Sequence, residues 1–320
     1  MYYISAASTI SHQPTFQNVG FSAAIQPVQA SSALLSPDYK EFIDAGLLRR
    51  MSKILRMSVA CAQDCIRQAE IEQPGAIIVG TGLGCLLDTE KFLNNVITIK
   101  GMLPPTSFIQ STHNTMAGQI SLSIGNHGYN MTHTQNTVSF ENALLDAMLL
   151  LDEKEENILV GAADEAIDFL NEISVKLHLH LHLPLTSGAS FFILSNQKND
   201  RSLAHVKDTR TFGLVDDAGD LISAFLIENQ VNVRDLDLVL FPGISKDSSG
   251  LIDLFANLGL DKGKCADYLC FSGIYPTTSA FALHLAVDKM KADKSLKNVL
   301  ICNTLIQSNL GLTLLQSVEA

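Results

Sequence analysis

The sequence predicts an α/β protein built of two similar halves, in which helices are layered on mixed, mostly parallel sheets. Three observations lead to this prediction. Short apolar runs that end in small residues, such as 76–80 and 157–163, are typical of strands buried on both faces. Segments with the apolar spacing of helices lie between these runs. The same alternation returns in the part of the chain after residue 200.

The elements of the first half follow from local patterns. Loose alternation over 3–30 indicates short strands and loops, and proline and acid at 36–38 indicate a helix start. Apolar residues at helical spacing predict a helix over 47–69. The remaining expected elements are a strand over 76–80 with a glycine turn at 81–84, a helix around 86–93, a short helix over 118–125, a strand over 131–134, a helix over 139–151, and strands over 157–163 and 190–194.

A polar stretch over 196–210 is the expected boundary between the halves. We therefore expect residues 1–200 to form an N-terminal half and residues 201–320 to form a shortened C-terminal half. The elements expected in the second half are strands over 236–242, 268–271, 298–303 and 310–315, with helices over 249–258 and 277–291.

The composition limits the classes of function. Of the 320 residues, 47% are hydrophobic and 17% are charged, which indicates a large core or a permanent subunit interface. The net charge of −11 argues against nucleic acid as a partner, because such proteins carry basic patches. The sequence has neither a membrane-spanning apolar run nor a secretory signal, so we expect a cytoplasmic protein without a membrane partner.

Several residues suggest chemistry but have simpler explanations. The turn Thr81-Gly82-Leu83-Gly84 lacks the lysine and glycine spacing of a phosphate loop, so a tight turn is expected. His178, His180 and His182 alternate with leucines, which would place three imidazoles on one strand face, as in some zinc sites. An exposed face or an entrance loop explains them better, and we expect no metal and no cofactor. The six cysteines are scattered, and only Cys85 lies at a position that suggests reactivity.

Blocks of the first half resemble β-ketoacyl synthases, which belong to the thiolase superfamily. The matching blocks, in chain order, are the Arg49-Arg50-Met51 segment, the strand and turn 78–84, the segments 105–108 and 114–120, the approach 128–132 and the strand 160–165. The resemblance covers nearly the whole first half and implies a thiolase-like fold. The second half matches only as a pattern of elements.

The resemblance also implies a chemistry that this chain cannot perform. The family places a cysteine on a sharp strand-to-helix turn, where the helix N-terminus lowers the pKa of the thiol. Counting from Gly128 places that position on Thr137, beside Gln135 and Asn136, and a threonine hydroxyl does not ionise near neutral pH. Glutamine often replaces the nucleophile in chain-length factors, although Gln135 lies two positions early by this count.

Two histidines from the second half complete the family's site, and both are missing here. The first is expected near Gly243 and Ile244, and the second near Gly273 and Ile274, yet neither loop contains a histidine. The glycine-rich loop expected near 303–309 is also missing. The chain therefore resembles the chain-length factors that pair with an active ketosynthase and shape the acyl tunnel across the dimer interface.

The expected function is that of a non-catalytic subunit. It would pair with an active β-ketoacyl-ACP synthase in fatty acid, polyketide or aryl-polyene synthesis, and would meet the acyl carrier protein indirectly. The pairing region is expected over 105–150. The residues expected at the acyl pocket or interface are Phe108, His113, Asn114, Gln135 and Phe140.

Two other classes stay open. The first is a divergent acyltransferase or hydrolase on the same fold that uses His113, Thr137 or Ser139, although no Gly-x-Ser-x-Gly elbow occurs. Glu141 and Asp164 would be a carboxylate pair in such an enzyme, or else simple helix-end and solvent contacts. The second class is a self-associating scaffold, a homodimer in which bulky side chains such as Phe140 fill the tunnel.

Overall fold

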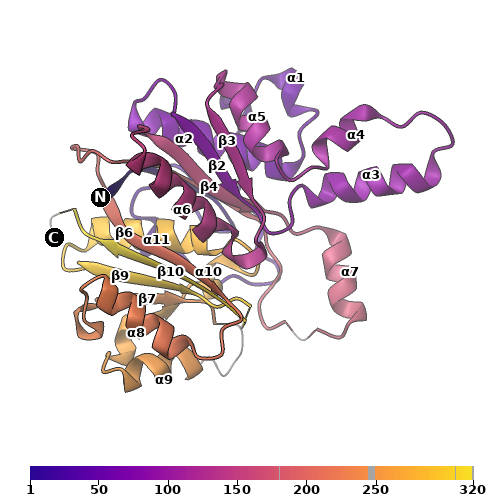
Figure 1. Ribbon diagram of the computed structural model, residues 1–320. Helices are drawn as coiled ribbons and strands as arrows, with labels where there is room; N and C mark the ends of the chain where they lie inside the picture. Colours follow the sequence, from indigo (N-terminus) through magenta and orange to yellow (C-terminus); the bar gives the residue numbers. More distant parts are fainter. Residues whose placement is uncertain (180, 244–248, 307, 319–320) are drawn as a thin grey trace.

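A single ten-stranded sheet organises the chain (Figure 1). The computed structural model describes residues 1–179, 181–243, 249–306 and 308–318. The strands are β1 (Tyr2–Ile10), β2 (Ala76–Gly80), β3 (Tyr129–His133), β4 (Ile158–Asp164), β5 (Gly188–Ser195), β6 (Ala204–Gly213), β7 (Leu238–Phe241), β8 (Cys265–Asp267), β9 (Asn298–Asn303) and β10 (Asn309–Gln316). Their order across the sheet is β3-β2-β4-β5-β1-β6-β10-β9-β7-β8.

Eleven α-helices and five short 3₁₀ helices surround these strands in the described part of the chain. The α-helices are α1 (Ala45–Leu48), α2 (Lys53–Ala69), α3 (Leu86–Thr98), α4 (Pro105–Gln110), α5 (Thr115–Ile124), α6 (Ser139–Asp152), α7 (Asp168–Lys176), α8 (Ala218–Glu228), α9 (Ser249–Asn257), α10 (Leu269–Ser272) and α11 (Ser279–Ala292). The 3₁₀ helices are η1 (Phe21–Ala23), η2 (Tyr39–Glu41), η3 (Asn136–Val138), η4 (Val233–Asp235) and η5 (Lys262–Lys264).

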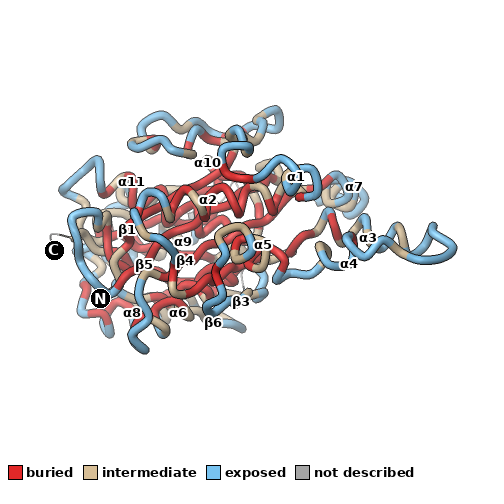
Figure 2. The backbone as a smooth tube through the Cα atoms, turned by 90° about the horizontal axis from the view of Figure 1, so that it is seen from above, coloured by how far each residue is buried: buried red, intermediate tan, exposed pale blue. Residues whose placement is uncertain are grey.

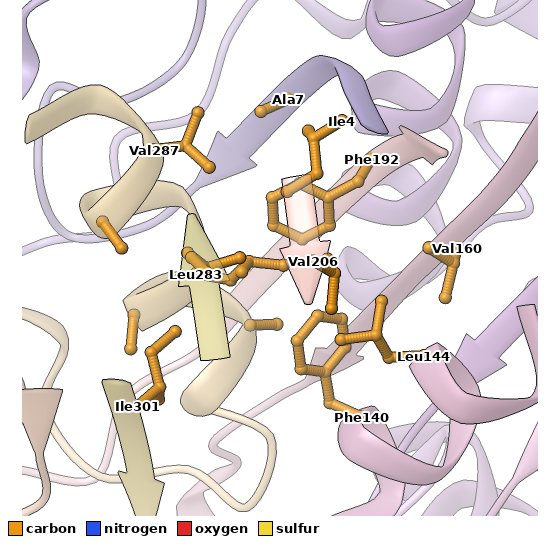
Figure 3. Packing of buried hydrophobic residues seen from close by; sticks show 14 of the residues in the cluster. Ile4, Ala7, Phe140, Leu144, Val160, Phe192, Val206, Leu283, Val287 and Ile301 are labelled. Carbon is orange, nitrogen blue, oxygen red and sulfur yellow. The ribbon is translucent and has the colours of Figure 1, made fainter. Parts of the chain in front are cut away.

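Three apolar clusters define the layers. The middle cluster packs α6 and α11 against strands from both ends of the sheet (Figure 3). A second cluster packs α2 and α5 against the outer face of β2, β4 and β5, and a third packs α8 against β7, β9 and β10. Helices therefore form the outer layers and also fill the space between the two arms of the sheet.

Helix α11 shows why its sequence forms a central helix. Eleven of its fourteen residues are buried, so the helix is buried on all sides rather than on one stripe. A helix of this kind is stable only when neighbours cover its whole circumference. In Figure 2, α2 and α11 lie in the buried centre, whereas α3 and α4 project away from it with much of their surface exposed.

The sheet is mixed, and the expectation of a mostly parallel sheet is wrong. Strand β2 is parallel to β3 and β4, and β7 is parallel to β8 and β9. The other five neighbouring pairs of described strands are antiparallel. One cause is the short connection of residues 304–308 between β9 and β10, which has room for a hairpin but not for a crossover helix.

Several local expectations were also wrong. Residues 268–271 do not form a strand, because β8 ends at Asp267. The carboxylate of Asp267 accepts a hydrogen bond from the N–H of Leu269 (2.8 Å), the first residue of α10. The polar stretch 196–210 is not all connection, because its residues from Ala204 onward form most of β6. As a boundary between the halves it stays a prediction. The predicted helix 47–69 is broken into α1 and α2, and the helix start at 36–38 leads only into η2.

No helix in the described ranges is both long and apolar enough to cross a bilayer.

Removing Phe192 should destabilise the fold. This side chain is fully buried in the middle cluster, 5.8 Å from the ring of Phe140. We expect Phe192→Ala to lower the free energy of unfolding by about 3–5 kcal/mol, because a cavity remains between the layers. Chemical denaturation measures this difference. The control Phe169→Ala removes a ring that is 45% exposed and should change stability by less than about 1 kcal/mol; equal effects would contradict the layer assignment.

Candidate functional site: a strand-to-helix elbow and its apolar cavity

Thr137 lies where the edge strand β3 turns into the buried helix α6. Between them, η3 begins at Asn136, which has a left-handed φ of 55°. Asparagine tolerates this conformation better than most residues. Thr137 is buried, and its hydroxyl has no hydrogen-bond partner, whereas Gln135 and Asn136 are exposed. Thr137 therefore lies in a sharp strand-to-helix turn with a buried, unpartnered hydroxyl, and its correspondence to the family's nucleophile stays a prediction.

Asn303 and Ser139 fix this elbow from two sides. The amide of Asn303, at the end of β9, donates to the carbonyl of Thr137 (2.7 Å) and to the carboxyl of Glu141 (2.9 Å). The hydroxyl of Ser139 lies 2.9 Å from the carbonyl of Thr81, in the turn after β2. Ser139 is fully buried and engaged in these backbone contacts, so it is placed as a structural group.

Asp164 joins three segments at the end of β4. Its carboxylate accepts hydrogen bonds from the hydroxyl of Thr81 (3.0 Å) and from the N–H groups of Gly82 (3.0 Å) and Leu83 (2.9 Å). On its other side it accepts the N–H (3.1 Å) and the hydroxyl (2.7 Å) of Thr277. Burial raises the pKa of Asp164, and these hydrogen bonds offset part of that rise.

The glycine turn is filled by the protein itself. The N–H groups of Gly82 and Leu83 point at Asp164, so they are not available to a phosphate. A Cβ atom on Gly82 would lie 2.3 Å from the Cβ of Pro276, which explains the need for glycine. The turn is a tight structural turn. Glu141 and Asp164 do not form a pair, because each has its own set of hydrogen-bond partners.

An apolar cavity of about 290 Å³ opens beside the elbow. It is lined by Thr137 from the elbow, Leu83 from the glycine turn and Leu305 from the segment after β9. Further walls come from α7 and from the loop before α11, which contributes Ile274 and Pro276. The cavity wall thus combines segments that lie far apart in the sequence. Its mainly apolar surface suits an apolar ligand.

Glu165 is the ionisable group of this cavity. Its side chain is buried; one carboxyl oxygen accepts the N–H of Leu87 (3.2 Å), and the other has no partner. Burial raises the pKa of Glu165 to about 7. The carboxyl therefore titrates near neutral pH, at the wall of a pocket that also contains Thr137.

The two loops expected to carry histidines hold other groups. The N–H of Gly243 binds Asp267 (2.8 Å), and the carbonyl of Gly243 lies 2.8 Å from Nε2 of His182. Ile244 lies outside the described residues. Gly273 has a left-handed φ of 71° and packs on Thr186, and Ile274 faces the cavity with an apolar side chain.

The structure separates the residues expected at the pocket or interface. Phe108 is exposed on α4, with its ring 5.4 Å from that of Phe92, and Asn114 is exposed before α5. His113 packs on Gly84 and is not part of the cavity wall. Phe140 is buried in the middle cluster (Figure 3), so it fills the core and not the cavity.

Neither His178 nor His182 lies on a strand. His178 follows α7 in a turn with a left-handed φ of 52°, and His180 lies outside the described residues. The described ranges contain no group of three side chains able to hold a metal ion. Cys85 is fully buried, and burial raises the pKa of its thiol, so it remains protonated and unreactive.

Asn303, Thr277 and Glu165 are site residues that the sequence reasoning missed. Asn303 is a polar residue at the carboxyl end of a buried strand, as Asp164 is. Polar residues at such strand ends often converge on a site in α/β sheets, and this signal would have identified Asn303. Nothing in the local sequence around Thr277 indicates that it reaches Asp164.

Comparison with known proteins identifies the family and the fold. Residues 25–230 match the family described as Beta-ketoacyl synthase, N-terminal domain. No curated protein matches the sequence. The predicted thiolase-like α/β fold is confirmed by this match and by solved structures that are similar over almost the entire chain.

Three of these structures illustrate the likeness. The ishigamide ketosynthase/chain length factor has a TM-score of 0.81 at 15% identity, and a β-ketoacyl synthase from Burkholderia phymatum has a TM-score of 0.80 at 11% identity; both matches cover 99% of each chain. The ketosynthase ApeO in complex with its chain length factor ApeC, from Xenorhabdus doucetiae, has a TM-score of 0.77 at 11% identity, covering 99% of this chain and 98% of that one.

Thr277→Val tests the role of Asp164. The change removes a hydroxyl that donates to a buried carboxylate, so the free energy of unfolding should fall by about 1–3 kcal/mol. Thr137→Val is the matched control, because its buried hydroxyl has no partner, and it should leave stability nearly unchanged. Urea denaturation of both variants measures the difference. A control as destabilised as Thr277→Val would refute this role.

Glu165 should make stability depend on pH. Its pKa is raised from 4.5 to about 7 in the folded protein, so the folded state binds this proton more tightly than the unfolded chain. The resulting stabilisation is complete below about pH 4.5 and is lost as pH rises to about 7. The Glu165→Gln variant should not show this loss. Between pH 4.5 and pH 7 its free energy of unfolding should therefore change relative to that of the unmodified chain by on the order of 2–3 kcal/mol.

Denaturation curves at pH 4.5, 5.5 and 7 measure this change. Glu172→Gln, an exposed position on α7, serves as the control and should follow the unmodified chain. If the pH profiles of Glu165→Gln and the unmodified chain run parallel, the assignment of Glu165 is wrong.

Proposed function

Because the chain belongs to the β-ketoacyl synthase family, we propose that it is a non-catalytic subunit of the chain-length-factor type. It pairs with an active β-ketoacyl-ACP synthase in fatty acid, polyketide or aryl-polyene synthesis. The acyl carrier protein then meets the complex mainly through the active subunit, since this chain carries a net charge of −11.

The elbow carries this proposal. The turn after β3 keeps its left-handed residue and its support from Asn303, but it presents the hydroxyl of Thr137 with no base bound to it. The loop before α11 brings the apolar side chains of Ile274 and Pro276 to the cavity, where the family's chemistry needs a histidine. A site with this geometry can hold an acyl chain, and no base is hydrogen-bonded to the hydroxyl of Thr137 in the described part of the chain.

The strand order supports a two-half organisation, with residues 1–200 and 201–320 as the halves. From β1 outward the order is β1-β5-β4-β2-β3, and from β6 outward it is β6-β10-β9-β7-β8. Counted along the chain, both are the first, fifth, fourth, second and third strand of a five-stranded unit. The connection over 196–203 separates these units.

The edge strand β3 supports pairing with another chain. In the described sheet its one neighbour is β2, so its outer hydrogen-bonding groups face away from the sheet. Tyr129 and Met131 are 39% and 41% exposed on this strand, and Leu122 is 77% exposed on α5. An unpaired edge next to exposed apolar residues is a common template for association.

The projecting arm of α3 and α4 extends this surface (Figure 1). Phe108 and Ile109 on α4 are more than half exposed, and Ile97 and Met102 are 81% and 95% exposed. A partner that covers the arm would bury this apolar surface. Two of the similar solved structures combine a ketosynthase with a chain length factor, which fits an active ketosynthase as the partner.

One observation favours a second candidate function, a divergent acyltransferase or hydrolase. Glu165, whose pKa is raised to about 7 by burial, shares the cavity with Thr137. A carboxylate at this pKa is suited to act as a general base. Incubation of the purified chain with acyl thioesters separates the two candidates, because the enzyme would gain a covalent acyl mass or release free thiol, and the non-catalytic subunit would do neither. Intact-mass measurement and a thiol assay read out the two results.

Co-expression with the ketosynthase of the same genome tests the proposed pairing. Native mass spectrometry should show a stable one-to-one complex. Met131→Lys places a charge on β3 and should weaken the complex at least tenfold, whereas Leu214→Lys, at a position that is 91% exposed before α8, should not. A homodimer that ignores the ketosynthase would contradict the proposal and favour the self-associating scaffold.

A further inference from the structure

A second cavity, of about 710 Å³, lies between α2 and α11. Ser5 and Ala7 of β1 form part of its wall, and segments around 17–19 and 200–203 form its rim. It shares no lining residue with the cavity at the elbow. The proposed function does not use it.

Two buried carboxylates line this cavity from opposite helices. Asp64 on α2 is 3% exposed and accepts hydrogen bonds from the side chains of Gln17 (2.9 Å) and Gln68 (2.7 Å). Asp288 on α11 is 5% exposed and accepts the N–H groups of Gly20 (2.7 Å) and Ser22 (2.9 Å). Neither carboxylate has an ion-pair partner within the described ranges.

His284, one helical turn before Asp288 on α11, adds a free acceptor to the cavity wall. Its Nδ1 lies 2.8 Å from the hydroxyl of Thr9, and that hydroxyl donates to Ser190 (2.9 Å), so Nδ1 carries the proton and donates. Burial lowers the pKa of His284 to about 4, so the ring is neutral and Nε2 keeps a lone pair. The side chain is 91% buried, lines the cavity, and its Nε2 has no partner among the described residues.

The rim has the opposite character. Lys291, Lys294 and Arg201 line it and are exposed, together with Asp200. Arg201 is paired with Glu70 outside the cavity, whereas the two lysines at the end of α11 have no ion-pair partner in the described part of the chain. The cavity is therefore rich in negative charge and acceptors inside, whereas its mouth carries two unpaired lysines against the one carboxylate of Asp200.

We propose that this cavity binds a small zwitterion, with its ammonium group inside and its anionic group at the mouth. The ammonium supplies a hydrogen-bond donor to the free Nε2 of His284, and its positive charge compensates the carboxylates of Asp64 and Asp288, which are buried without a counter-ion. The anionic group, a carboxylate or a phosphate, lies against Lys291 and Lys294. Amino acids and amino-alcohol phosphates share this chemistry.

Calorimetric titration of the full chain tests this inference. The probes are the zwitterions L-alanine and O-phosphoethanolamine. The controls are ethanolamine, which carries only positive charge, and inorganic phosphate, which carries only negative charge. At least one zwitterion should bind ten or more times tighter than both controls. Tighter binding of L-alanine would indicate a carboxylate ligand, and tighter binding of O-phosphoethanolamine would indicate a phosphate ligand.

Variants assign the binding to this cavity. The double change Lys291→Ala and Lys294→Ala alters only exposed positions and should weaken binding at least fivefold, and Asp64→Asn should weaken it further. Lys176→Ala, an exposed lysine on α7, should have no effect. Melting temperatures verify that each variant is folded.

Two results would overturn the inference. The first is that no zwitterion binds more tightly than inorganic phosphate or ethanolamine, which would reduce the cavity to a solvent-filled gap with charged walls. The second is that folded Lys291→Ala/Lys294→Ala protein binds the zwitterion as well as the unmodified chain does.

Discussion

The buried carboxylate of Asp164 is the interaction on which the site depends. It receives five donors from two segments, the turn after β2 and the loop before α11, which are distant in the sequence. Without it, the N–H groups of Gly82, Leu83 and Thr277 would be buried without an acceptor, and each would cost stability. Because the same two segments line the apolar cavity, Asp164 sets the shape of the pocket as well as the stability of its walls.

The elbow shows how packing and hydrogen bonds hold a sharp strand-to-helix turn. The left-handed Asn136 and the contact from Asn303 hold the strand-to-helix turn in place. The backbone conformation is needed for β3 to lead directly into the buried helix α6, so packing maintains it whether or not a nucleophile is present. Thr137 and Ile274 then line the apolar cavity beside the turn. What remains is suited to binding, and the exposed edge at β3 is suited to association.

Much of the fold could be predicted from the sequence, because its buried strands are continuous apolar runs. The strand 76–80 and the helix that begins at Ser139 were predicted and are observed. Thr137 lies in the turn before that helix, and its correspondence to the family's nucleophile stays a prediction. Strand β6 and helix α7 were not predicted. Most residues of β6 are polar, so it lacks the apolar run of a buried strand, and α7 has no buried residues. The role of Asp164 was also beyond prediction, because its partner Thr277 is recognisable only in three dimensions.

Reconstitution of the extension reaction tests the central claim most directly. A purified ketosynthase from the same genome is supplied with malonyl-loaded and acyl-loaded carrier protein, with and without this chain. The lengths of the carrier-bound products are measured by mass spectrometry. The account predicts that this chain alone makes no product and that its addition changes the amount or length of the ketosynthase's product. Extension by this chain alone would contradict the account.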